Sequence, residues 1–196
     1  TLFAHYAYST CYLLVGVGFL SGAMVKHGLH KRIALGIVSK VGKKPTTLIL
    51  GFIIAVGFVS MWMSNTTATV MMLPVALAIS STLGDNAAGL KKAMVLAIPY
   101  AATIGGMATV IGTTTNPTGI GLIRETIGID IDFLDWMKIG LPFTVILIPF
   151  FWLYMVKFFK VDKMPPTDIS IARRQYEELG PMNKGEKWVA AIFVLC

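Results

Sequence analysis

The sequence predicts an all-α, polytopic membrane protein, and the uneven distribution of its charges is the first reason. Of the 196 residues, 55% are hydrophobic and 14% are charged, whereas about a quarter of an ordinary soluble domain is charged. Five stretches hold none of the 17 basic and 10 acidic residues: 1–25, 45–84, 93–123, 139–156 and 188–196. Because a soluble protein carries charges on every surface helix, this pattern excludes a soluble globular enzyme, a disordered chain and a disulfide scaffold.

The second reason is a polar interruption in the longest charge-free stretch. Residues 45–84 would extend about 60 Å as a single helix, which is twice the roughly 30 Å of the hydrocarbon layer. The polar tetrapeptide in the middle of the stretch is Ser64-Asn65-Thr66-Thr67. The stretch therefore either crosses the membrane twice or enters and returns, and we predict a re-entrant hairpin with this tetrapeptide at its tip.

The charges of the linkers give the third reason. Their net charges are +6 in 26–44, +1 in 85–92, −2 in 124–138 and +2 in 157–187. The positive-inside rule places the acidic linker outside, which requires an even number of passes between the first two linkers. The net charge of +7 has the same origin. We therefore predict a lipid environment and no nucleic-acid partner, since no basic patch is interleaved with aromatic residues.

The other elements follow from length and composition. Residues 1–25 and 139–156 are predicted transmembrane helices, and 188–196 is the predicted start of a truncated one. Residues 93–123 are too long for one straight span and contain a polar loop, so they predict a broken transmembrane helix. Residues 165–181 predict a cytoplasmic surface helix.

Residues 26–44 predict an interfacial amphipathic helix. Apolar residues recur at every fourth position: Leu29, Ile33, Ile37 and Val41. The basic residues able to snorkel toward headgroups are Lys31, Arg32, Lys40 and Lys43. We therefore expect this helix to lie on the membrane surface.

The two polar breaks are the candidate functional sites. Irregular backbone at membrane depth persists only where protein buries it or a watery cavity lines it. A helix that ends near Met63 would offer free carbonyls to a cation, and a helix that starts near Thr66 would offer N–H groups to an anion. In the second break, Asn116 is expected to cap a helix beginning at Pro117. The alternative is that these small polar residues only pack helices together.

Other chemistry is not indicated. His5, His27 and His30 have no metal-ligand spacing, and neither a nucleophile–base pair nor a phosphate loop is present. We therefore predict that the chain is not an enzyme.

Two linked motifs resemble one known family. Residues 61–74 (MWMSNTTATVMMLP) resemble the SNT signature of the divalent anion/sodium symporter family, whose members carry di- and tricarboxylates or sulfate. Residues 104–109 (IGGMAT) and 111–117 (IGTTTNP) resemble its second signature, and 133–142 (FLDWMKIGLP) is also similar. The resemblance covers nearly the whole chain.

The resemblance implies a fold and a set of site residues. The chain would be most of the first of two inverted repeats, in a homodimer that works by an elevator mechanism in the cell (inner) membrane. The implied sodium-binding residues are Ser60, Ser64, Asn65 and Gly112. The residues implied to touch a small anionic substrate (dicarboxylate, citrate or sulfate) are Asn65, Thr66 and Thr113. Two other interpretations remain open: a sodium-independent dicarboxylate exchanger of the same fold, and a non-transporting membrane scaffold subunit.

Overall fold

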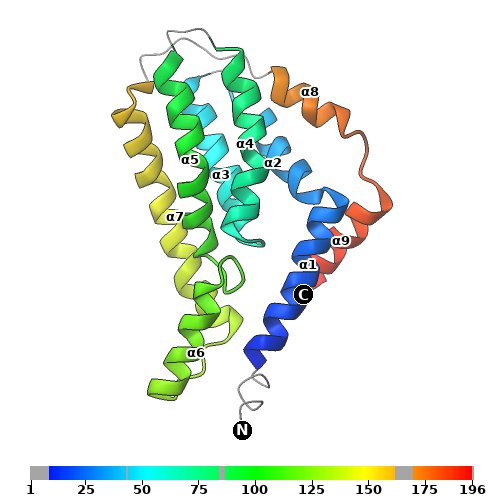
Figure 1. Cartoon of the computed structure of the whole chain (residues 1–196), viewed down its shortest axis with the longest axis vertical. Coiled ribbons are helices and arrows are strands. Elements are labelled where there is room, and N and C mark those ends of the chain that lie inside the picture. Colours follow the sequence, from blue (N-terminus) through cyan, green and yellow to red (C-terminus); the bar gives the residue numbers. More distant parts are fainter. Residues whose placement is uncertain (1–8, 43, 84–86, 162–169, 196) are drawn as a thin grey trace.

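The computed structural model describes residues 9–42, 44–83, 87–161 and 170–195, and within these residues it contains helices and no strand. The helices are α1 (Ser9–His27), α2 (Leu29–Ser39), α3 (Pro45–Ser60), α4 (Asn65–Ser81), α5 (Ala88–Gly106), α6 (Thr115–Ile127), α7 (Phe133–Phe158), α8 (Ser170–Glu178) and α9 (Lys184–Leu195) (Figure 1). The all-α prediction is confirmed for the described residues. Several predicted segments extend outside them, at 1–8, 43, 84–86, 165–169 and 196.

The centre of the molecule is a bundle of α3, α4, α5 and α7 (Figure 1). Helix α5 packs against both halves of the α3–α4 hairpin, and α7 packs against α3 and α5. The fully buried side chains include Phe52 and Ile53 of α3 and Met94 and Ile98 of α5. Between helices in a bilayer such side chains stabilise the bundle by van der Waals packing, because lipid tails are as apolar as the side chains themselves.

Helices α3 and α5 touch backbone to backbone. A Cβ on Gly105 would overlap the Gly57 carbonyl oxygen and would lie 2.5 Å from the Gly57 Cα. Small residues allow this close approach between membrane helices. Gly57 lies three residues before the end of α3, and Gly105 is the last residue but one of α5, so the contact holds the two helix ends beside each other.

Helix α7 has the length and composition of a membrane span. It has 26 residues and contains Pro142 and Pro149, which membrane helices tolerate. Its start is fixed by Asp132, whose carboxylate accepts a hydrogen bond from the Asp135 N–H at 2.7 Å. Among the described helices, α7 is the one long and apolar enough to cross a membrane, while α3 and α4 are shorter apolar helices.

A second group of helices lies beside the bundle. Helix α9 lies alongside α1, and α8 packs across α2 (Figure 1). The chain turns from α1 into α2 at Gly28, whose φ of 77° is the left-handed conformation that glycine adopts without strain. On α8, Ala172 is buried, and the Tyr176 ring lies against Gly36 of α2.

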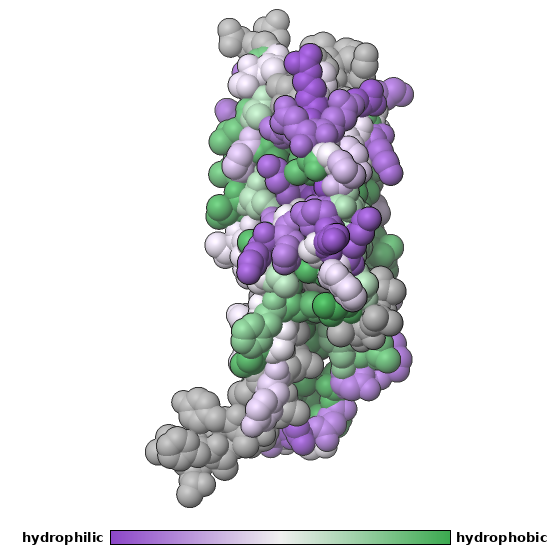
Figure 2. All heavy atoms as spheres, turned by 90° about the vertical axis from the view of Figure 1, so that its right-hand side faces the viewer, coloured by the Kyte–Doolittle hydropathy of each residue, from purple (hydrophilic) through white to green (hydrophobic). Residues whose placement is uncertain are grey.

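The amphipathic pattern of α2 predicted its buried face only in part. Ala34, Leu35 and Val38 are fully buried, whereas Ile33 and Ile37 are partly exposed. The difference arises because α2 packs between α3 and α8 and so buries side chains on more than one face. Hydrophilic residues gather instead over α8 and the segment leading to α9 (Figure 2).

Candidate functional site

The first break is a tight turn between α3 and α4. Helix α3 ends at Ser60, three residues before the predicted end near Met63, and α4 begins at Asn65, close to the predicted start near Thr66. Ser64 is the N-cap, because its hydroxyl oxygen accepts a hydrogen bond from the Thr67 N–H at 3.3 Å and lies 2.7 Å from the Thr67 hydroxyl. The Ser64 side chain is therefore engaged in starting α4.

Ser60 and Asn65 join the two ends of this turn. The Ser60 hydroxyl is fully buried and donates a hydrogen bond to Asn65 Oδ1 at 2.8 Å. The same amide oxygen lies against Gly106 at the end of α5, where a Cβ would overlap it. Asn65 thus extends from the first break to the start of the second.

The second break separates α5 from α6. A Cβ on Gly112 would lie 2.7 Å from the Gly106 Cα, so the loop folds back onto the end of α5. The Asn116 amide donates hydrogen bonds to the carbonyls of Gly106 (2.9 Å) and Thr109 (2.7 Å). The expectation that Asn116 caps the following helix is therefore wrong. Asn116 instead holds carbonyls at the end of α5 and in the loop, and Thr114 is the N-cap of α6.

Helix α7 satisfies further carbonyls at the end of α5. The Trp136 indole N–H donates to the Met107 carbonyl at 3.0 Å, and the Thr144 hydroxyl donates to the Ile104 carbonyl at 3.1 Å. Orphan carbonyls at a helix end need such partners when they are buried. These carbonyls are already paired, so the end of α5 is a weaker candidate for a cation than the end of α3.

Two oxygen atoms converge on Gly106. A Cβ on this residue would overlap Asn65 Oδ1 and would lie 3.2 Å from the Gly112 carbonyl oxygen. The missing side chain of Gly106 therefore lets the Asn65 amide oxygen come close to its Cα, and a side chain at this position would displace that oxygen. Of the predicted sodium ligands, Ser60, Asn65 and Gly112 are brought together here, while Ser64 lies exposed at the turn.

Two of the predicted substrate residues, Thr66 and Thr113, are less buried than the cluster around Gly106. Thr66 is exposed on the first turn of α4, and the Thr113 hydroxyl lies 3.2 Å from that of Thr115. No hydrogen bond within the described residues joins Thr66 or Thr113 to the Asn65 cluster. Exposed hydroxyls at helix starts remain able to contact a ligand that approaches from outside the chain.

Two residues of the site were not singled out in the sequence: Gly106 and Thr109. Their one signal is that both lie in the 104–109 motif. Their partners lie on other helices, so the local sequence does not identify them.

Neither break contains a charged side chain. Within the described residues, no group of three His, Cys, Asp or Glu side chains could hold a metal ion. A cavity of about 430 Å³ lies between α6 and the start of α7, where Arg124 pairs with Asp130 at 2.8 Å. Val110 and Pro117 also line it, so this cavity borders the second break.

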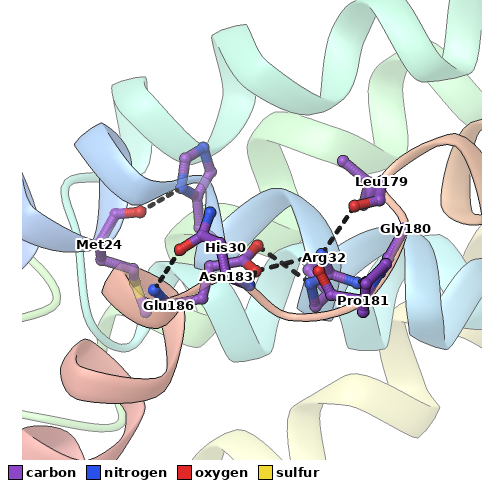
Figure 3. Close-up of polar contacts among 8 residues, drawn as sticks. All are labelled: Met24, His30, Arg32, Leu179, Gly180, Pro181, Asn183 and Glu186. Atoms are coloured by element: carbon purple, nitrogen blue, oxygen red, sulfur yellow. Dashed lines mark hydrogen bonds and ion pairs between the residues drawn. The ribbon is translucent and has the colours of Figure 1, made fainter.

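Charged groups are paired at a different place, where α2 meets the α8–α9 turn (Figure 3). Arg32 Nε and Nη2 donate to the two carboxylate oxygens of Glu186 at 3.0 and 3.1 Å. Arg32 also donates to the carbonyls of Leu179 (3.0 Å) and Gly180 (2.7 Å). The two charged side chains are only 11% and 4% exposed, so the expectation that Arg32 snorkels is wrong, because a distant carboxylate binds it inside the protein.

Two ionisable groups at this junction have shifted pKa values. The hydrogen bond from Arg32 lowers the pKa of the Glu186 carboxyl group. Burial lowers the pKa of His30, whose Nδ1 lies 2.9 Å from the Met24 carbonyl oxygen. Glu186 is therefore charged and His30 neutral near pH 7.

An all-α bundle with two polar, charge-free helix ends side by side is typical of helical membrane transporters. The comparisons with known proteins identify the family. The family model described as "Citrate transporter" matches residues 1–196, and the chain belongs to this family. This confirms the kinship that the SNT signature indicated.

Curated relatives are similar along the same region. The sodium-dependent dicarboxylate transporter SdcS of Staphylococcus aureus strain USA300 is 36% identical over 203 residues, covering 98% of this chain and 39% of SdcS. SdcS of strain NCTC 8325 / PS 47 has the same identity and coverage. The chain therefore spans about two fifths of the length of the curated relatives it matches. These relatives are transporters and not enzymes, in agreement with the sequence prediction.

Proposed function

We propose that the protein containing this chain is a secondary active transporter that moves di- or tricarboxylate or sulfate anions across a membrane, coupled to sodium. The observation that carries the proposal is the convergence of the Asn65 amide oxygen and the Gly112 carbonyl on Gly106, between helix ends that carry no charged side chain. The names of the relatives, which are sodium-dependent dicarboxylate transporters, support the choice of ion and substrate.

The sodium ion is proposed to bind between the two breaks. Its ligands are oxygens of Ser60, Ser64, Asn65 and Gly112, at the C-terminal end of α3. Helix C-terminal ends and unwound carbonyls are the groups that coordinate sodium in such transporters, because they carry partial negative charge. The burial of Ser60 and its hydrogen bond to Asn65 at 2.8 Å support this arrangement.

The anion is proposed to bind at the starts of α4 and α6, through Asn65, Thr66 and Thr113. Helix N-termini present free N–H groups and about half a positive charge. Because neither break contains Lys or Arg, the bound sodium would supply the full positive charge. Anion binding should therefore depend on sodium.

The proposed membrane arrangement follows from helix length. Helices α3 and α4 have 16 and 17 residues, which is about 24–26 Å at 1.5 Å per residue and less than the roughly 30 Å hydrocarbon layer. This supports a re-entrant hairpin whose tip lies inside the membrane. Helices α5 and α6, with the loop between them, are proposed as one broken transmembrane helix.

The larger assembly is part of the same proposal. The chain is proposed as the first of two inverted repeats, in a homodimer that works by an elevator mechanism in the inner membrane. Under this arrangement, segments 1–25, 139–156 and 188–196 lie in the membrane, while 26–44 and 165–181 lie at its cytoplasmic face. The second repeat would supply the other half of the anion site.

Uptake of labelled succinate, citrate or sulfate by proteoliposomes tests the proposal. The full-length protein should take up at least one of these anions when an inward sodium gradient is imposed, and not when choline replaces sodium. Uptake without sodium, driven by an internal dicarboxylate, would instead support an exchanger. No uptake of any of the three anions, with Asn65→Ala weakening assembly only, would support the scaffold interpretation.

A further inference from the structure

Thr109 joins the two breaks by hydrogen bonds. Its hydroxyl donates to the Met61 carbonyl oxygen at 2.5 Å, in the turn between α3 and α4, 48 residues away in the sequence. The same oxygen accepts a hydrogen bond from the Gly112 N–H at 3.2 Å. One side chain therefore contacts the first break and the second break at once.

Thr109 makes these bonds in a dry environment. Its side chain is fully buried, and the Asn116 amide donates to its carbonyl at 2.7 Å. A hydroxyl has one donor hydrogen and can accept through its oxygen, so both roles of this group are used. Loss of the hydroxyl would leave the Met61 carbonyl without its partner and would leave the Gly112 N–H with only its longer bond, to the Thr109 carbonyl at 3.4 Å.

We infer that Thr109 is a positioning residue for the cation site, setting the distance between the Asn65 side chain and the Gly112 carbonyl. This inference rests on the proposed function. Gly112 donates its N–H to Thr109, and its carbonyl faces Gly106 beside Asn65. Met61 lies between Ser60 and Asn65 in the sequence, so the bond to its carbonyl holds the turn that carries Asn65. Thr109 contacts neither the ion nor the substrate.

The consequence for transport is specific. A small displacement of one ligand group weakens a site whose geometry is preorganised. Loss of the Thr109 hydroxyl should therefore raise the sodium concentration needed for half-maximal uptake. The same change should alter the anion affinity at saturating sodium much less, because the proposed anion contacts do not involve the hydrogen bonds of Thr109 to Met61 and Gly112.

The chain offers a matched control in Thr144. Its side chain is also fully buried, and its hydroxyl also donates to a carbonyl, that of Ile104 at 3.1 Å. That bond joins α7 to α5 and does not connect the two breaks. Thr109→Val and Thr144→Val each remove one buried hydroxyl at nearly constant volume, so they differ mainly in which segments the lost bond connected.

The experiment measures sodium-dependent succinate uptake by the full-length protein in proteoliposomes. Thr109→Val should raise the half-saturating sodium concentration about ten-fold, the change that corresponds to about 1.4 kcal/mol. Thr144→Val should change the half-saturating sodium concentration by less than about two-fold. Thr109→Ser, which keeps the hydroxyl, should retain the native value. If Thr109→Val does not accumulate, Thr109→Cys, with its weak donor, replaces it and should give a smaller rise in the same direction.

Two results would overturn the inference. The first is an unchanged half-saturating sodium concentration in Thr109→Val, and the second is an equal rise in Thr144→Val. Either result, with sodium-driven uptake by the unmodified protein, rejects the role of Thr109 and leaves the proposed function in place. Sodium-independent uptake by the unmodified protein would instead reject the proposed function itself.

Discussion

The two polar regions of this molecule are stabilised in opposite ways. At the junction of α2 with the α8–α9 turn, Arg32 and Glu186 form a buried ion pair, and each charge has further hydrogen bonds. At the two breaks, Ser60, Asn65, Thr109 and Asn116 make neutral hydrogen bonds only. The junction contains both the positive and the negative group that it needs. The breaks present partial charges at helix ends, so full charges there have to come from bound ions.

This difference suits the junction to a structural contact and the breaks to the binding site proposed above. A buried ion pair is costly to separate, which suits a joint that holds two helices together. Helix ends without side-chain charges avoid the roughly 2.5–3.5 kcal/mol that insertion scales give for a charged residue at the bilayer centre. Variants of the two regions should therefore affect different measurements: stability for the junction and ligand affinity for the breaks.

The largest effect is expected for Arg32→Ala. This change leaves the Glu186 carboxylate buried without its partner, which typically costs about 3–5 kcal/mol. Thermal unfolding of the purified full-length protein should shift to a clearly lower temperature, while the folded fraction keeps its half-saturating sodium concentration. The control is Arg124→Ala, which breaks an exposed pair with side chains 45% and 74% exposed and should cost at most about 1 kcal/mol. Equal decreases in the unfolding temperatures of the two variants would show that the buried ion pair contributes no more to stability than the exposed one.

The next effect in size, on sodium binding rather than on stability, is expected for Gly106→Ala. The added methyl would overlap Asn65 Oδ1 and crowd the Gly112 carbonyl, so it would displace these two proposed ligand oxygens. The half-saturating sodium concentration should rise at least about ten-fold, or about 1.4 kcal/mol. Gly119→Ala serves as the control, because no atom lies within 4 Å of the position of its new methyl. A normal sodium response in Gly106→Ala would place the cation elsewhere.

A smaller effect is expected for the two outer threonines. Thr66→Ala and Thr113→Ala each remove one hydroxyl donor from a proposed carboxylate site, which costs about 0.5–3 kcal/mol. Succinate affinity at saturating sodium should fall roughly two- to a hundred-fold. Thr118→Ala should have little effect, since that hydroxyl donates to the Thr114 carbonyl within its own helix at 2.8 Å. Native affinity in both outer variants would contradict the assignment of these helix starts to the anion.

The smallest effect concerns pH at the junction. Burial lowers the pKa of His30 below its usual value of about 6.5, so the neutral form is favoured in the folded protein. Its stabilising contribution is therefore complete above pH 6.5 and is lost as the pH falls through the lowered folded-state pKa. The Glu186 pKa is lowered as well, so its contribution is complete above the usual carboxyl pKa and is lost as the pH falls through the lowered folded-state pKa.

The His30 contribution can be isolated with His30→Asn, whose amide can still donate to the Met24 carbonyl. The unfolding temperature of the unmodified protein should decrease between pH 7 and pH 5.5 by more than that of the variant. An equal decrease in unfolding temperature for the two proteins would show that His30 does not cause the pH dependence.

The sequence was sufficient to predict features that depend on local pattern. Charge-free stretches predicted the helical class, and the tetrapeptide at Ser64 predicted an interruption that the structure places between α3 and α4. The family resemblance implied Gly112 as a sodium ligand, and the structure places Gly112 against Gly106 at the end of α5.

Features that depend on distant partners were not predictable. Arg32 looked like a surface cation because Glu186 is 154 residues away. Asn116 looked like an N-cap because the carbonyls it binds belong to the preceding helix and loop, which only folding brings back to it. Thr109 had no local signal beyond its place in the 104–109 motif, since its partner Met61 lies on another helical hairpin. In each case the sequence shows that the side chain can form hydrogen bonds, but the partner it bonds to depends on how the helices pack.

Sodium dependence of anion binding tests most directly whether the charge-free breaks form a coupled site. Succinate binding to the full-length protein is measured by calorimetry at several sodium concentrations, with potassium keeping the ionic strength constant. The dissociation constant for succinate should fall as sodium rises, and Asn65→Ala should weaken this dependence. A succinate affinity that is tight and identical with and without sodium would contradict the proposal that bound sodium supplies the charge that the helix ends lack.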